Sequence, residues 1–476
     1  MLFNSIEFAI FLITVWVLYW KVFARHHQAQ NTFLLVVSYV FYGWWDYRFL
    51  GLIFLSSLVD YVASRQIGAA TRPGVRKAWV GLSLLVNLGA LMFFKYFNFF
   101  ADSLQELAGL AGITLDAITL NIILPVGISF YTFQTLSYTI DVYRKQIEPE
   151  RNVINFFAYV SFFPQLVAGP IERASRLLPQ FKARRTWDYA QQADGFRQIL
   201  WGLTKKIVLA DGVAYQVYWI YNNYEDVGGL TLLLGGFLFL LQIYGDFSGY
   251  SDIALGTAKL LGFRLMVNFN RPFFSKNFTD VWRRWHMSLG AWFRDYVYIP
   301  LGGNRRGRSR RVFNLCLTLL LMAFWHGASW NMIMWGVWLC IFQVPDLYFT
   351  RLRERLTPSA AWAREVIDGF KRIRTFALLA FSFIIFRADT FEGGLTYYKR
   401  IFTSTDWWVV PERAWSPYTL WIFAGVMLLE ALQGDREHPL QWQRMPWPVR
   451  WLLYFGLSAL IAMFFDRQIS FIYFQF

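Results

Sequence analysis

Long apolar runs recur along the whole chain and are separated by short polar or basic stretches. A helix that crosses a bilayer needs about 20 mostly apolar residues, whereas a transmembrane barrel has short segments of alternating hydrophobicity. The pattern therefore predicts an all-α polytopic membrane protein with about eleven or twelve transmembrane helices plus re-entrant helices. The predicted apolar runs lie near 6–20, 33–45, 49–64, 78–94, 118–140, 207–221, 230–256, 312–347, 375–387, 417–433 and 450–465.

One apolar stretch, residues 154–185, is interrupted and does not resemble a simple crossing. It reads "INFFAYVSFFPQLVAGPIERASRLLPQFKARR", with breaks at Pro164, Gly169 and Pro170 and basic residues on both sides. A full crossing would place one basic flank outside, so the sequence predicts a re-entrant hairpin. Broken backbone at membrane depth is tolerated only where protein or a cavity covers it. The stretch is thus a first indication of an internal cavity.

The basic residues follow the loops between these runs. Lys and Arg total 46 against 31 acidic residues, which gives a formal net charge of +15. In a soluble protein this excess would suggest nucleic-acid binding, but here the clusters at 65–77, 305–311 and 351–374 fit cytoplasmic loops that set the topology. We therefore expect the lipid bilayer as a partner and no nucleic acid. The run 6–20 has no signal-peptide pattern and is predicted to be a retained helix.

A histidine lies inside the run "FNLCLTLLLMAFWHGASWNMIMWGVWLCIF", which has no charged residue from Phe313 to Phe342. His326 follows the basic Arg311 by fifteen residues, or about 22 Å of helix, which puts it near the outer bend of a helical pair. A structural histidine bonded to a neighbouring helix is one interpretation. Ionisable groups at such depth are more often functional, and a neutral imidazole can act as a general base. Ser329 and Asn331 supply polar groups at the bend.

A second histidine lies in the string "FTDVWRRWHMSLGAWF". Tryptophans at 282, 285 and 292 recur at helical spacing, as in an interfacial amphipathic helix with a solvated His286. Alternatively, His286 and His326 mark the two ends of one tunnel, with His286 near the cytoplasm. Arg283 and Arg284, with the 305–311 cluster and Trp285, would then form a mouth for a phosphate-bearing donor, because guanidinium groups bind phosphate well. Most of these arginines are better explained as topology signals.

A third set of polar residues lies in "QIYGDFSGYSDIALG" and the sequence after it. Asp246 and Asp252 are costly in an apolar span, so they either pair with basic residues or line the cavity. Asn270 could orient a ligand. The sequence has no P-loop or GxGxxG string, and its two cysteines have no CxxC spacing, so no metal site is expected.

Taken together, "PQLVAGPIER", "YGDFSGYSDIALGTAKLLGFRLMVNFNRPFFSKNFTDVWRRWHMSLGAWFRDYVYIPLGGNRRG" and "AFWHGASWN" resemble the membrane-bound O-acyltransferase family, in particular its branch of alginate O-acetyltransferases. The resemblance covers essentially the whole chain. It implies a single membrane-embedded domain, 1–476, whose helices enclose a tunnel, with 242–347 as the catalytic core. It also implies that His326 is the catalytic histidine and His286 the second conserved position of this branch.

The resemblance further implies a function. An acyl thioester, acetyl-coenzyme A, would serve as the cytoplasmic donor substrate, without a bound cofactor. The acceptor side would involve an extracytoplasmic SGNH-type acetyltransferase as partner and a polysaccharide as final acceptor, in the inner (cytoplasmic) membrane of the cell. Two alternatives stay open: D-alanyl transfer from a carrier protein to a teichoic acid-type polymer, and a transporter or channel with a histidine gate.

Overall fold

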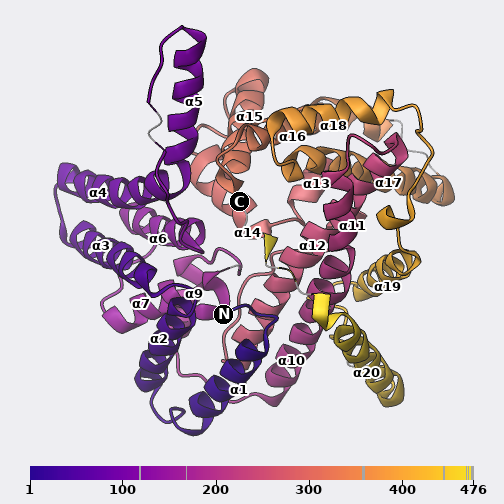
Figure 1. The fold of residues 1–476 in the computed structure, drawn as a ribbon. Coiled ribbons are helices and arrows are strands. Elements are labelled where there is room, and N and C mark those ends of the chain that lie inside the picture. The colour runs from indigo at the N-terminus through magenta and orange to yellow at the C-terminus, as the bar shows by residue number, and fades with distance from the viewer. Residues whose placement is uncertain are drawn as a thin grey trace. The chain divides into compact units, whose positions relative to one another are not determined.

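The computed structural model describes residues 1–116, 119–167, 169–355, 360–442, 445–467, 469 and 471–472, and every regular element in these ranges is helical (Figure 1). The architecture is therefore all-α, as the apolar runs predict. The α-helices are α1 (Ile6–Lys21), α2 (His27–Gly43), α3 (Leu50–Ala69), α4 (Pro73–Leu91), α5 (Phe97–Leu110), α6 (Ile128–Tyr143), α7 (Val153–Ser161), α8 (Phe163–Leu166), α9 (Ala174–Lys182), α10 (Tyr189–Leu203), α11 (Asp211–Asn222), α12 (Gly229–Leu260), α13 (Phe278–Trp282), α14 (Met287–Phe293), α15 (Gly307–His326), α16 (Trp330–Arg355), α17 (Ala361–Arg387), α18 (Phe391–Thr403), α19 (Pro417–Gln433) and α20 (Trp447–Phe464).

Most of the predicted apolar runs fall on helices, but residues 119–127 of the predicted run 118–140 are not helical, and several helices, among them α5, α9 and α18, lie outside the runs. Among the described residues, five helical stretches are long and apolar enough to cross a membrane on length and composition alone. Shorter helices such as α1, with 16 residues, also fall on predicted runs. The all-α polytopic class is thus confirmed, and the number of crossings stays a prediction. The five stretches are Tyr47–Ala69, Pro73–Leu110, Gly229–Leu260, Glu412–Gln433 and Trp447–Phe464.

The chain forms two compact units. Unit 1 comprises Met1–Gly195 with Thr257–Met266, and unit 2 comprises Phe196–Gly256 with Val267–Phe476. In unit 1, helices α3, α4 and α6 pack side by side (Figure 1). The carboxylate of Asp60 on α3 accepts hydrogen bonds from Ser83 and Asn87 on α4 and from Thr139 on α6. Polar side chains in these apolar helices are therefore satisfied by one another, as buried polar groups must be.

The interrupted stretch of unit 1 breaks where the sequence predicts. α7 ends at Ser161, α8 holds Pro164 in its first turn, and α9 begins only at Ala174. The side-chain amides of Gln134 and Gln165 both donate to the carbonyl oxygen of Tyr159. These bonds replace the helical hydrogen bonds lost at the break. The interruption is confirmed, and its re-entry into the membrane stays a prediction.

In unit 2, the π-helical segment Thr204–Ala210, which joins α10 to α11, crosses α12 at glycines. A Cβ atom on Gly249 would lie 2.7 Å from the carbonyl oxygen of Gly202, and one on Gly245 would lie 2.8 Å from that of Lys205. The two backbones can approach this closely only because these positions have no side chain. The glycines of "YGDFSGYSD" therefore serve helix packing.

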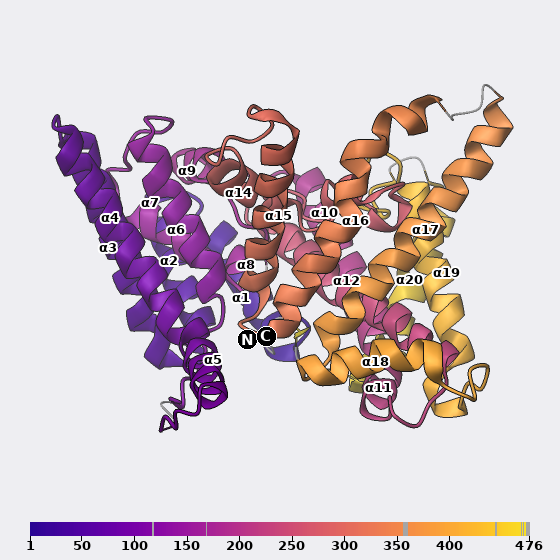
Figure 2. The ribbon, with the colours of Figure 1, turned by 90° about the horizontal axis from the view of Figure 1, so that it is seen from above.

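The long run 312–347 divides into two helices, as predicted. α15 ends at His326 and α16 begins at Trp330, with Gly327–Ser329 as the connection. α16 packs against α15 along one side and against α17 along another (Figure 2). The break places His326 at the junction of α15 and α16, in unit 2.

Candidate active site

His326 is the last residue of α15 and lies in an aromatic enclosure. It is 6% exposed, and its ring centroid lies 5.4 Å from that of Trp335 and 5.8 Å from that of Phe386. The basic residues 305–311 lie at the opposite end of the same helix, which spans about 30 Å for its 20 residues. Residues 311–326 therefore form one continuous helix, and the depth of His326 in the membrane stays a prediction.

His286 lies beside His326. The two imidazole centroids are 6.1 Å apart, and His286 is 3% exposed, with the Phe247 ring 4.6 Å away. The hypothesis that the two histidines mark opposite ends of a tunnel, with His286 near the cytoplasm, is therefore wrong. The interpretation of His286 as a solvated residue of an interfacial helix is wrong as well.

The reason is the local backbone. α13 ends at Trp282, and His286 takes a left-handed conformation with φ of 44°, so the chain turns sharply before α14 begins. The backbone N–H of Met287 donates to the carbonyl of Asn268, and that of Asn270 donates to the carbonyl of Arg284, which joins the two segments. Helical spacing of the tryptophans could not reveal this turn, because residues of two short helices and a loop share that spacing.

Asn268 fixes the ring of His286. The amide oxygen of Asn268 lies 3.2 Å from Nδ1 of His286 and accepts from the hydroxyl and the backbone N–H of Ser288. Because this oxygen can only accept, the proton of the neutral imidazole lies on Nδ1 and Nε2 carries the lone pair. Burial lowers the pKa of His286 to about 3. The pair of histidines therefore includes one ring that is neutral at physiological pH.

The two predicted aspartates form ion pairs. Asp246 and Asp211 share the ammonium of Lys206, with N–O distances of 2.8 and 2.7 Å, and Asp252 pairs with Lys205 at 2.6 Å. Of the two alternatives, pairing with basic residues is the one the structure contains. The sequence did not single out either lysine, because the predicted run begins at residue 207, directly after them.

The other predicted polar residues lie at two places. At the α15–α16 junction, the Asn331 amide donates to the carbonyl of Ala388 at 2.5 Å, and the Ser329 hydroxyl accepts from the N–H of Met332 at 3.4 Å. Near α13, Arg284 pairs with Asp280 and Arg283 is exposed. Phosphate binding by these arginines stays a prediction.

Aromatic side chains form the wall around the histidines. Trp335 is 1% exposed and packs its ring 5.3 and 5.0 Å from Phe383 and Phe386 of α17. Trp285, expected at the donor site, is buried and packs 5.6 Å from Phe383. In the part of the chain that the structure describes, no partner lies within hydrogen-bonding reach of the indole N–H of Trp335. No sequence pattern distinguished Trp335, since tryptophans are common in this chain.

This arrangement can support proton transfer. A buried imidazole beside an oriented second imidazole, with an available N–H donor nearby, offers a base and a donor in a site of low dielectric constant. The residues that the structure describes contain no group of three His, Cys, Asp or Glu side chains placed to hold a metal ion. The two imidazoles are groups of the kind that general acid–base catalysis uses.

Comparison with known proteins gives a consistent result. The model of the MBOAT, membrane-bound O-acyltransferase family, matches residues 147–388, which include both histidines. A probable alginate O-acetylase of Azotobacter vinelandii is 38% identical over 409 residues, which is 86% of this chain and 79% of that protein. A peptidoglycan O-acetyltransferase of Helicobacter pylori is 29% identical over 80% of this chain and 75% of its own length. A teichoic acid D-alanyltransferase of Bacillus subtilis is 28% identical over 57% of this chain and 71% of its own length.

Proposed function

The chain belongs to the membrane-bound O-acyltransferase family, and from this premise we propose the reaction that it catalyses as a multi-pass membrane O-acyltransferase. It transfers an acetyl group from cytoplasmic acetyl-coenzyme A to a hydroxyl on the far side of the inner membrane, for O-acetylation of a polysaccharide. The observation that carries this proposal is the buried pair of His286 and His326, at the end of α15 opposite the basic cluster.

In the proposed reaction, His326 acts as the general base. The acceptor hydroxyl gives its proton to the imidazole while its oxygen attacks the carbonyl carbon of the thioester. The C–S bond then breaks, and the leaving thiolate takes the proton from the imidazolium. His286, held by Asn268, positions the donor beside His326 through its Nε2 lone pair.

The attack places negative charge on the thioester oxygen, which needs a hydrogen-bond donor. The side-chain amide of Asn331, a polar group at the bend, already donates to the carbonyl of Ala388. Trp335 lies one helical turn further along α16, against the ring of His326, with a buried N–H that has no partner among the described residues. Leaving such a donor unsatisfied costs about 1–3 kcal/mol, so we assign it to the thioester oxygen.

The two substrates approach from opposite ends of α15. The phosphates of coenzyme A bind near the exposed basic residues 305–311, and the acceptor reaches His326 from the α15–α16 junction. The names of the relatives, an alginate O-acetylase and a peptidoglycan O-acetyltransferase, support a polysaccharide as final acceptor. An extracytoplasmic SGNH-type acetyltransferase would receive the acetyl group and pass it to the polymer.

The test uses the purified protein in vesicles with acetyl-coenzyme A labelled on the acetyl group. Cleavage of the thioester should fall at least about 10³-fold in His326→Ala, since the base is lost. His27→Ala, a histidine of α2 in unit 1, is the control and should keep wild-type activity. Wild-type activity in His326→Ala would contradict the proposal. Turnover only with an acylated carrier protein would favour D-alanyl transfer, and passage of label without cleavage would favour a transporter.

A further inference from the structure

Three aromatic rings of the enclosure around His326 form a closed triangle. The centroid of the His326 ring lies 5.4 Å from that of Trp335 and 5.8 Å from that of Phe386, and the centroids of Trp335 and Phe386 are 5.0 Å apart. Centroid separations of about 4.5–7 Å are those of aromatic rings in contact. Each ring therefore touches the other two, and little space is left between them.

Phe386 is the member of this triangle that has no polar atom in its side chain. In the proposed reaction, His326 faces the attacking hydroxyl, and the N–H of Trp335 binds the thioester oxygen. Besides this oxygen and the sulfur, the carbonyl carbon carries only the acyl chain. Because the positions beside His326 and Trp335 are taken, we expect the acyl chain to start against the ring of Phe386, which is 2% exposed.

More aromatic rings pack against Phe386. Its centroid lies 5.4 Å from that of Phe383 and 6.2 Å from that of Phe239, and both of these side chains are buried. Adding methylene groups to a well-packed interior forces side chains out of their favoured rotamers. The methyl group of an acetyl donor needs little room at this place, whereas a longer acyl chain has to displace Phe386 and its neighbours.

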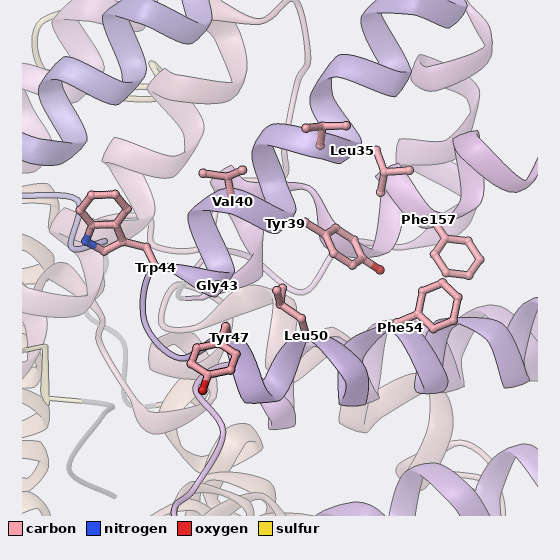
Figure 3. A pocket seen from close by; sticks show the side chains of 10 residues that line it. Leu35, Tyr39, Val40, Gly43, Trp44, Tyr47, Leu50, Phe54 and Phe157 are labelled. Carbon is pink, nitrogen blue, oxygen red and sulfur yellow. The ribbon is translucent and has the colours of Figure 1, made fainter.

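Open space exists close to these rings. Phe239 also lines a pocket of about 100 Å³ in unit 2, together with residues such as Ala214 and Val217 of α11. One water molecule needs only about 10–15 Å³ on this scale, so the pocket has room for several carbon atoms. A larger groove, between α2 and α3, belongs to unit 1, whereas both histidines belong to unit 2 (Figure 3). The packing near Phe386 can therefore relax once its ring is removed.

We propose that Phe386 limits the donor to an acetyl group by excluding longer acyl chains from the side of His326. The inference rests on the proposed reaction and adds the residue that selects its donor. One methylene group in an apolar site changes kcat/KM by about 10–200-fold. Butyryl-coenzyme A has two more methylene groups than acetyl-coenzyme A, so its kcat/KM for thioester cleavage should be at least about 100-fold lower.

The test measures kcat/KM for cleavage of both thioesters by the purified full chain in vesicles. Phe386→Ala should raise the ratio of butyryl to acetyl cleavage at least about tenfold over wild type, because the lost ring leaves a cavity for the longer chain. Phe381→Ala is the matched control, since it removes a ring from the same helix, α17. Phe381 packs 4.7 Å from Tyr398 and 5.5 Å from Trp338, so its ratio should equal that of wild type.

A second variant keeps the test independent of stability. Phe386→Leu removes less volume and should raise the ratio in the same direction by a smaller factor, and thermal unfolding shows that each variant is folded. Equal use of the two thioesters by wild type would overturn the chain-length limit, as would equal ratios in Phe386→Ala and Phe381→Ala. Both results leave the proposed reaction standing, which fails instead if His326→Ala cleaves acetyl-coenzyme A at the wild-type rate.

Discussion

Replacing Lys206 with methionine tests how the buried charges hold unit 2 together. The ammonium is 1% exposed and contacts the carboxylates of Asp211 and Asp246 and the carbonyl oxygen of Ile469, at 2.7, 2.8 and 2.9 Å. Methionine keeps the length of the side chain but leaves two carboxylates buried without a cation. Removing one partner of a buried ion pair costs about 3–5 kcal/mol. Since Lys206 pairs with two carboxylates, we expect its replacement to lower the free energy of unfolding by at least about 3 kcal/mol.

The assay is thermal unfolding of the detergent-solubilised protein, followed by tryptophan fluorescence. A protein of this size shifts by about 1–2 °C per kcal/mol, so the apparent midpoint of Lys206→Met should fall by about 5 °C. Lys276→Met is the matched control, because Lys276 pairs with Asp368 but its side chain is 43% exposed, and such pairs contribute about 0–1 kcal/mol. Adding Asp211→Asn and Asp246→Asn to Lys206→Met should recover part of the loss. Midpoints of Lys206→Met and Lys276→Met within about 2 °C of each other would refute the reasoning.

Three further predictions concern the site and its support. Trp335→Phe should lower kcat for thioester cleavage about 10²-fold with little change in KM. The control is Trp338→Phe, which should stay near wild type because the ring of Trp338 packs on Phe342 instead. Equal rates in the two variants would contradict the assignment of Trp335 as the oxyanion donor. Because burial lowers the pKa of His286 to about 3, the unfolded state binds more protons than the folded state between about pH 3 and 6.5, so the stability falls as the pH drops through this window. His286→Gln should therefore flatten the dependence of the unfolding midpoint on pH. An unchanged slope would contradict the buried neutral ring. Gly249→Ala should disrupt the helix crossing and lower expression, because the new Cβ would lie 2.7 Å from the carbonyl oxygen of Gly202. Gly89→Ala in α4 is the control and should be neutral or stabilising, because the space around Gly89 is open. Normal expression of Gly249→Ala would show that the crossing can relax.

The sequence predicted the helical class and the place of His326 because both depend on the length of apolar runs. Counting residues from Arg311 is enough to give the distance of His326 from the basic cluster, since α15 is a regular helix. The position of His286 could not be predicted, because it depends on one left-handed residue that turns the chain. A single backbone angle leaves no mark in hydrophobic periodicity, and "WRRWH" reads equally well as a surface helix.

The buried charges show a similar division. Two aspartates in an apolar run indicate that each needs a polar or basic partner. Ion pairing was therefore one of the two interpretations that the sequence suggested for Asp246 and Asp252. The sequence could not name Lys205 and Lys206, which lie about 40 residues earlier at the edge of another run. Their contact depends on the approach of two backbones at Gly202, Gly245 and Gly249, and such an approach is a tertiary property.

The glycine crossing also constrains how the protein enters its membrane during synthesis. Lys205 and Lys206 emerge from the ribosome about 40 residues before Asp246, so at that moment only Asp211 is at hand as a counter-ion. A lysine inside a membrane segment costs up to about 2.5–3.5 kcal/mol on insertion, and less near the edge of the segment. We therefore expect this segment to insert more readily together with α12, which carries Asp246 and Asp252. A nascent chain halted before residue 246 should insert this segment less efficiently.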